Sequence, residues 1–268
     1  MERQVWLAER RAALVAAYDA EAATYGDEEY PWDMQREWVA RVLRLIPPGG
    51  TVLDAACGTG KYFAMLAAAG HRVAGADQSA GMLARARARG IAFSLEHTSL
   101  QDLSYSGQFD AVLAIDAMEH IPPEDWPGVL ANLHRAVRPG GLLYLTVGEL
   151  EQHHVERAFE SLSARGLPAV RGELAEGDSA GYHYYPGLDQ AADWFGQQGW
   201  RSSTRASGGK TGGAIATSCC APARLRQRHD TVRYCSLRRL PRRRSASRPH
   251  RLPLTPAFAR RPTAAAPA

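Results

Sequence analysis

A glycine-containing segment and one downstream aspartate are the residues whose types and spacing best fit ligand chemistry. The segment Asp54-Ala55-Ala56-Cys57-Gly58-Thr59-Gly60 follows an apolar run, and Asp77 lies 23 residues after its first member. Gly58 and Gly60 allow a ligand to approach the backbone closely, and the start of a following helix offers free N–H groups. Asp77 has the reach to accept both hydroxyls of a ribose. These features indicate a cofactor that contains adenosine.

The residue at position 63 narrows the choice of cofactor. A dinucleotide-binding fingerprint that starts at Gly58 needs a small residue there, and this chain has Phe63. The bulky ring argues against a loop that grips a pyrophosphate.

The elements that must position these residues alternate between strand and helix. An alternating order, with the strongest strand apolar on both faces, predicts a Rossmann-like, doubly wound, mostly parallel sheet with helices on both faces. Ligands of such sheets bind beyond the carboxyl ends of the strands. The expected strands are 51–54, 72–76, 92–96, 109–115 and 142–147, and the expected helices are 6–18, 32–46, 61–69, 79–89, 124–137 and 149–165.

Five motifs follow one another along the chain. They are Val52-Leu53-Asp54-x-x-Cys57-Gly58-Thr59-Gly60, Asp77, Phe109-Asp110-Ala111-Val112, Asp116-x-x-Glu119-His120 and Arg138-Pro139-Gly140-Gly141. In this order they resemble the motifs of the class I S-adenosylmethionine-dependent methyltransferases. The resemblance runs from about Tyr18 to Trp200 and is strongest to small-molecule methyltransferases similar to those of ubiquinone and menaquinone biosynthesis.

The resemblance implies S-adenosyl-L-methionine as cofactor and assigns residues to it by position. The methionine end would be shaped by Asp54, Ala56, Gly58 and Gly60, and the ribose would be held by Asp77. The adenine would lie beside Gln78 and Met82, under the loop that contains Ser99 and Leu100, and Tyr25 would close over the donor. Two positions depart from the family: the first glycine of the loop is Ala56, and the aspartate that often meets the adenine amino group is Ser99, whose task Gln101 or Asp102 could take.

The group Asp116, Glu119 and His120 is the expected catalytic group, because it follows the fourth predicted strand. A bound sulfonium makes its methyl group electrophilic, so the protein mainly holds a nucleophile in line and excludes water. His120 is the first candidate for accepting or steering a proton. The alternative that Glu119 and His120 are ordinary polar residues of a loop stays open. Related enzymes can bind a divalent metal at such a pattern, but no fourth ligand is evident and we predict no metal site.

Aromatic residues flank the predicted core and are candidates for enclosing the substrate. We expect Tyr182, His183, Tyr184 and Tyr185 to contact a small-molecule acceptor, with a packed loop as the alternative. Tyr18, like Tyr25, either closes over the donor or packs the first helices onto the core. His153 and His154 are adjacent, so we expect them to diverge and to be exposed.

Charge divides the chain at about residue 200. Residues 1–200 hold 16 basic and 27 acidic residues, a net charge of −11, whereas residues 201–268 hold 16 basic residues against Asp230 alone, a net charge of +15. We therefore expect N-terminal helices that form a lid and substrate wall over 1–50, a cofactor-binding core with an inserted substrate segment over 51–204, and a basic, Pro/Arg-rich, disordered tail over 205–268.

The composition changes where the family's last two strands should begin. We therefore expect that strand pair to be missing or disrupted, with a frame-shifted C-terminus as the favoured explanation and a native basic arm as the alternative.

Small-molecule methylation of an O or N atom is the function these observations predict. The alternatives are a nucleic-acid methyltransferase or binding protein guided by the tail, which the acidic core argues against, and an inactive cofactor-binding remnant. No apolar run is long enough to cross a bilayer and the four cysteines form no paired metal motif, so a cytoplasmic protein without membrane contact is expected. The acceptor and the oligomeric state stay open.

Overall fold

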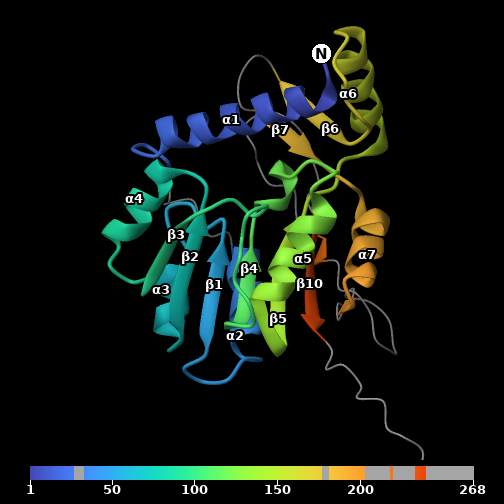
Figure 1. The fold of residues 1–268 in the computed structure, drawn as a ribbon. Coiled ribbons are helices and arrows are strands. Elements are labelled where there is room, and N and C mark those ends of the chain that lie inside the picture. Colours follow the sequence, from blue (N-terminus) through green and yellow to red (C-terminus); the bar gives the residue numbers. More distant parts are fainter. Residues whose placement is uncertain (27–32, 177–180, 203–217, 220–232, 240–268) are drawn as a thin grey trace, which may run out of the picture.

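A twisted, mostly parallel sheet forms the centre of the computed structural model, which describes residues 1–26, 33–176, 181–202, 218–219 and 233–239 (Figure 1). The strand order is β3-β2-β1-β4-β5-β10-β8, and β9 pairs with β10. The bounds are Thr51–Ala55 (β1), Arg72–Asp77 (β2), Ser94–His97 (β3), Phe109–Ala114 (β4), Val137–Val147 (β5), Trp200–Ser202 (β8), Ser218–Cys219 (β9) and Arg233–Arg239 (β10).

Helices cover both faces of this sheet, as the sequence predicts. One face packs against α2, α3 and α4, and the other packs against α5 and α7. Alternate residues of the buried strands serve the two faces: Leu53 and Val112 belong to one core, while Val52 and Leu113 belong to the other. The bounds are Arg3–Glu21 (α1), Asp33–Leu43 (α2), Phe63–Ala68 (α3), Ala80–Ala88 (α4), Trp126–Ala136 (α5), Gln152–Ala164 (α6) and Leu188–Gln197 (α7).

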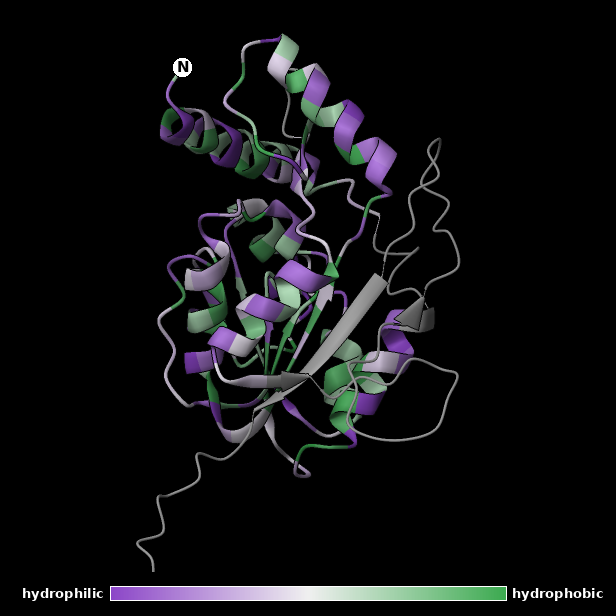
Figure 2. Cartoon of the chain, turned by 90° about the vertical axis from the view of Figure 1, so that its right-hand side faces the viewer, coloured by the Kyte–Doolittle hydropathy of each residue, from purple (hydrophilic) through white to green (hydrophobic). Residues whose placement is uncertain are grey.

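A second, smaller sheet lies above the main one. It pairs β6 (Glu173–Glu176) antiparallel with β7 (Gly181–Tyr184), and the sequence analysis does not foresee it. Helix α1 crosses above the upper edge of the main sheet and passes beside this pair, and α6 stands next to the pair (Figure 1). The central strands are hydrophobic, whereas the surrounding helices mix hydrophobic and hydrophilic residues (Figure 2). None of the described helices is long and apolar enough to span a membrane.

The motif at 138–141 interrupts the pairing between β4 and β5, although it lies within strand β5. Phe109 pairs with Val137, but Ala111 pairs with Leu142, so the segment 138–141 bulges out of the ladder within β5. Gly140 has φ +82°, and a Cβ at Gly141 would lie 2.7 Å from the carbonyl oxygen of Asp110. The two glycines therefore let this bulge form against β4.

The end of the sheet differs from the sequence prediction. Strand β10 pairs antiparallel with β5, and β8 pairs antiparallel with β10, so the strand pair is present although β8 has only three residues. Two strands of the expected disordered tail, β9 and β10, thus belong to the sheet, and the other residues of 205–268 lie outside the described residues. Without a neighbouring strand on this side, β5 would expose a row of backbone N–H and C=O groups. Another segment can pair with these groups through its own backbone, even when its side chains show no alternating apolar pattern.

Candidate active site

A pocket of about 350 Å³ opens at the carboxyl ends of β1, β2, β4 and β5, where ligands of such sheets bind. Loops after these strands, η1 (Met118–His120), the end of α1 and the segment after β7 all contribute to it. Its lining residues are Tyr18, Tyr25, Ala56, Cys57, Gly58, Thr59, Lys61, Asp77, Gln78, Met82, Thr98, Ser99, Leu100, Gln101, Ile115, Asp116, Ala117, Glu119, His120, Ile121, Thr146, Gly148, His183 and Tyr185.

Asp77 and the loop after β1 hold each other in place. The backbone N–H of Gly58 donates to Oδ2 of Asp77 at 2.7 Å, and that of Ser79 donates to Oδ1 at 2.8 Å. Each carboxylate oxygen keeps a further lone pair, so both can still accept a hydroxyl. Burial raises the pKa of Asp77, and the backbone hydrogen bonds oppose that rise. The site thus offers a fixed, paired acceptor.

The loop itself has an unusual backbone. Ala56 has φ +63° and Gly58 has φ +53°, in the left-handed region that L-residues with a Cβ avoid. A Cβ at Gly58 would meet nothing within 4 Å, so this position leaves open space beside the loop. The departure from the family pattern at Ala56 therefore carries strain that a glycine there would not.

Gly60 and Asp54 support this loop from outside the pocket. A Cβ at Gly60, with φ +75°, would lie 2.6 Å from the ring of Phe63, and neither Gly60 nor Asp54 lines the cavity. Asp54 is 2% exposed, and its Oδ2 has no hydrogen-bond partner among the described residues. Burial raises the pKa of Asp54 to about 7, while Lys61 lowers it.

Four of the residues expected around an adenine line one end of the pocket. They are Gln78, Met82, Ser99 and Leu100. The Ser99 hydroxyl donates to Oδ2 of Asp102 at 2.6 Å. Of the two residues that could replace the family's aspartate, Gln101 lines the pocket and Asp102 does not.

Asp116 lines the pocket and lies at the centre of a polar network. Nε2 of Gln35 donates to its two oxygens at 3.0 and 2.7 Å, and Nζ of Lys61 donates to Oδ2 at 3.4 Å. Its backbone N–H donates to Oγ1 of Thr146 at 2.7 Å, and its φ is +51°. Asp116 is therefore held by three segments that are far apart in the sequence.

His120 is fixed between two partners. Nδ1 lies 3.3 Å from the carbonyl oxygen of Tyr182, and Nε2 lies 3.0 Å from the Tyr18 hydroxyl. Because a carbonyl can only accept, Nδ1 carries the proton and Nε2 accepts from Tyr18. Burial and the neighbouring His183 lower the pKa of His120 to about 4, so the imidazole is neutral at pH 7.

Glu119 is also neutral at that pH, because burial shifts the pKa of a carboxyl in the opposite direction. Burial, with a further contribution from Asp116, raises its pKa to about 8. The pocket therefore has two side chains, Glu119 and His120, that are both uncharged at pH 7 although each is titratable.

The aromatic segment divides between the pocket and the core. His183 and Tyr185 line the cavity, whereas Tyr182 and Tyr184 are buried in the hydrophobic core. The Tyr182 hydroxyl donates to Oε1 of Glu173 at 2.7 Å, and Tyr184 packs edge-on against Trp126. The expected contact of Tyr182 and Tyr184 with a substrate is therefore corrected: side chains alternate along β7, so only every second one faces the pocket.

Helix α1 brings Tyr18 and Tyr25 to the pocket. Oδ1 of Asp19 accepts from the backbone N–H of Gly81 at 2.8 Å and from the Ser79 hydroxyl. Arg85 of α4 donates to the carbonyl oxygen of Tyr25 at 2.7 Å. These bonds hold the end of α1 and the following turn over the cavity.

The three residues that hold Asp116 are not predicted from the sequence: Gln35, Lys61 and Thr146. Lys61 directly follows Gly60 and is one of only two lysines in the chain, which is a usable signal. Gln35 and Thr146 show no comparable sequence signal, because an amide or a hydroxyl side chain within a helix or strand is common.

Comparison with known proteins identifies the family that part of the chain resembles. Residues 52–141 match the family model described as a methyltransferase domain. This part of the chain is thus similar to methyltransferase domains. The resemblance stated from the sequence is thus confirmed for these residues.

Relatives of this methyltransferase domain match it over about half of their length. The trans-aconitate 2-methyltransferase of Deinococcus radiodurans is 36% identical over 137 residues, which cover 49% of this chain and 52% of that protein. The ubiquinone biosynthesis O-methyltransferase of Pseudomonas paraeruginosa is 35% identical over 104 residues, or 37% and 44% of the two chains. The chain therefore spans about half the length of the curated relatives it matches.

Solved structures share the fold over most of the chain. The 1,6-didemethyltoxoflavin-N1-methyltransferase of Burkholderia thailandensis, solved with S-adenosylhomocysteine, has a TM-score of 0.62 at 17% identity and covers 90% of this chain and 91% of that one. A magnesium protoporphyrin IX methyltransferase of Synechocystis has a TM-score of 0.57 at 19% identity, with 86% and 97% covered. At such identities the likeness shows the fold of the methyltransferase domain alone.

Proposed function

We propose that this chain transfers the methyl group of S-adenosyl-L-methionine to an O or N atom of a small molecule. The observation that carries the proposal is one pocket that joins the Gly58–Asp77 pair to the polar residues Glu119 and His120. The first pair suits the donor and the second suits an acceptor.

The residues present fit the cofactor. The open space beside Gly58 can admit the methionine part, and the paired oxygens of Asp77 can accept the ribose hydroxyls. Met82 and Leu100 would flank the adenine with apolar atoms, and Gln101 offers an amide at its rim. Oδ2 of Asp54 is buried behind the loop and has no hydrogen-bond partner among the described residues. A negative charge on this carboxylate would favour binding of the cationic methionine end of the donor.

The reaction needs little chemistry from the protein beyond position. The sulfonium of the bound donor supplies an electrophilic methyl group. Tyr18, Tyr25 and Tyr185 surround the cavity and would exclude water, which favours an in-line approach of the acceptor. His120 is a weak base, since its pKa is about 4, and its Nε2 already accepts from Tyr18. It would therefore hold the Tyr18 hydroxyl, whose oxygen can accept from an acceptor hydroxyl or amine, and would not store a proton.

Calorimetric titration with S-adenosylhomocysteine tests the donor site. We expect the full chain to bind it and Asp77→Ala to lose at least about tenfold in affinity, because a bidentate acceptor is removed. Asp193→Ala, an exposed residue of α7, is the matched control and should bind like the parent. Equal binding by Asp77→Ala, or none by a parent chain that circular dichroism shows to be folded, would refute the proposal.

Two other functions remain as outcomes of the follow-up assays. A nucleic-acid substrate predicts a salt-dependent shift with RNA, which the net charge of −11 over residues 1–200 disfavours. An inactive remnant predicts donor binding without turnover on any acceptor. A screen of O- and N-acceptors with tritiated donor separates both from the proposed reaction.

A further inference from the structure

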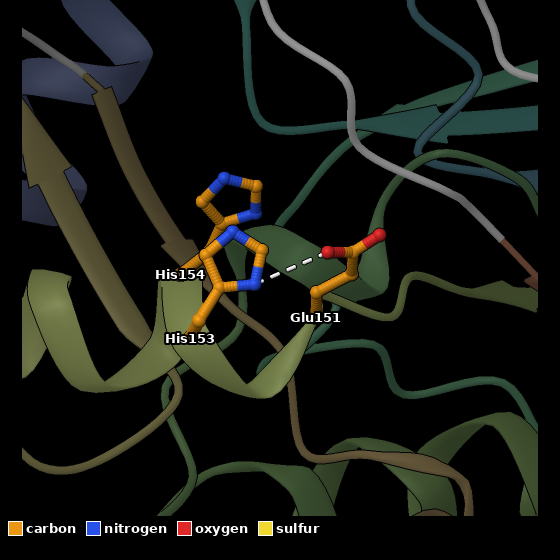
Figure 3. Close-up of side chains that lie close together, drawn as sticks. All are labelled: Glu151, His153 and His154. Carbon is orange, nitrogen blue, oxygen red and sulfur yellow. Dashed lines mark ion pairs between the residues drawn. The ribbon is translucent and has the colours of Figure 1, made fainter.

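Outside the pocket, the first turn of α6 gathers three side chains that can ligate a metal ion. Glu151, His153 and His154 each offer one ligand atom, and these atoms lie within 4.8 Å of one another. Figure 3 shows both imidazoles and the carboxylate on the same side of the turn. The ring centroids of the two histidines are 3.9 Å apart, so the sequence expectation that adjacent histidines diverge is wrong here.

We propose that Glu151, His153 and His154 bind a divalent transition-metal ion such as Zn²⁺. Two histidines and one carboxylate form a donor set that zinc uses in proteins when its fourth position is left to water or another small ligand. The site is thus an open one. Glu151 follows three residues after Gly148, which lines the pocket, so the site stands at the start of the segment that leaves it.

The spacing within the cluster suits such an ion. Nδ1 of His153 lies 3.1 Å from Oε2 of Glu151. Bonds of about 2.0–2.1 Å in a tetrahedral site separate two donors by roughly 3.3 Å, so this pair already has nearly the required distance. Only His154 must move closer, and a rotation about its side-chain bonds provides that movement.

The contact between His153 and Glu151 also leaves room for a cation. It is an ion pair only when the imidazole is protonated. In the neutral tautomer with its proton on Nε2, Nδ1 presents a lone pair beside the carboxylate, and a cation stabilises that arrangement. The neighbouring carboxylate of Glu156 has other partners, Arg171 at 3.1 Å and Gln152 at 2.7 Å, so it does not compete for the histidines.

The dipole of α6 disfavours a cation at the start of the helix, but local hydrogen bonds weaken this effect. The positive end of a helix dipole lies at the N-terminus, where α6 begins. However, the backbone N–H groups of His154 and Val155 already donate to the carbonyl oxygen of Glu151, at 2.8 and 3.2 Å. The anionic carboxylate of Glu151 then stands between this helix end and the ion.

The test is titration of the tag-free, metal-stripped full chain with Zn²⁺ at pH 7.5, followed by calorimetry. The double variant His153→Ala/His154→Ala should bind one equivalent fewer than the parent. Comparing stoichiometries removes any contribution of the cysteines at 219, 220 and 235, which both proteins share. Glu151→Gln should weaken the same site by at least about tenfold, because it loses the charged ligand.

A spectroscopic readout and a matched control complete the experiment. With Cu²⁺, electron paramagnetic resonance should show coupling to two imidazole nitrogens in the parent and to one in His153→Ala. His97→Ala, an exposed histidine outside the cluster, should leave both readouts unchanged. An equal stoichiometry in parent and double variant, or nitrogen coupling that His153→Ala leaves intact, would overturn the proposal.

Discussion

Replacing Asp54 by Asn should stabilise the fold, and by more at high pH than at low pH. Asp54 is fully buried, and burial raises its pKa from 3.8 to about 7. A carboxyl whose pKa is higher in the folded than in the unfolded state contributes stability below its unfolded pKa and loses it as the pH rises through the folded pKa. The isosteric amide cannot ionise and so avoids that loss.

The magnitude follows from the difference between the two pKa values. A rise of about 3 corresponds to about 4 kcal/mol at pH 8, since each pH unit is worth 1.36 kcal/mol. At pH 5 only the interval between pH 3.8 and pH 5 contributes, so the free-energy cost of ionising the buried carboxyl is about 2 kcal/mol. The stability advantage of Asp54→Asn should therefore grow by about 2 kcal/mol between pH 5 and pH 8.

Urea unfolding followed by circular dichroism at pH 5, 6.5 and 8 measures this advantage without cofactor. Glu9→Gln, on the exposed side of α1, is the control and should show no trend with pH. A constant difference between Asp54→Asn and the parent at all three pH values would refute the reasoning, because it would mean that Asp54 does not titrate in this range.

Three further predictions address strain, the buried ion pair and the donor site. Ala56→Gly should raise the free energy of unfolding by up to about 1 kcal/mol in thermal melts, since the φ of +63° then costs nothing. Glu173→Gln should lower it by about 3–5 kcal/mol, because this 0% exposed carboxylate accepts from Arg3 and Tyr182. Between pH 7 and 9, affinity for S-adenosylmethionine should rise more than that for S-adenosylhomocysteine, because Glu119, with a pKa of about 8, ionises in the pocket that would also hold the positively charged sulfonium. Glu119→Gln should abolish this difference, and parallel pH profiles in the parent would contradict the assignment.

The sheet and the donor half of the site follow from local sequence signals. The apolar strands, the glycine loop and Asp77 can each be recognised from a few consecutive residues. The structure then brings together at one pocket Ala56, Gly58, Asp77, Gln78 and Met82. Carboxyl ends of neighbouring parallel strands meet at one edge, so this convergence needs no knowledge of side-chain packing.

The acceptor half depends on contacts between distant segments. Gln35 reaches Asp116 across 81 residues, and Tyr18 reaches His120 across 102, and no periodicity encodes such pairs. Tyr182 and Tyr184 face the core, whereas His183 and Tyr185 face the pocket. This alternation could have been predicted if the segment had been recognised as a strand. The pairing of β10 with β5 could not, because backbone hydrogen bonds alone define it.

Helix α1 is held at its two ends by parts of the chain that lie far apart. Arg3 at its start binds Glu173, the first residue of β6, at 2.7 Å, and Asp19 near its end binds the first turn of α4. Tyr18, next to the second attachment, lines the pocket, so we expect loss of the first attachment to loosen this wall. The residence time of a ligand should then depend partly on Glu173, a residue that does not line the cavity. Weakening that attachment should appear as faster dissociation, with the contacts to the ligand itself unchanged.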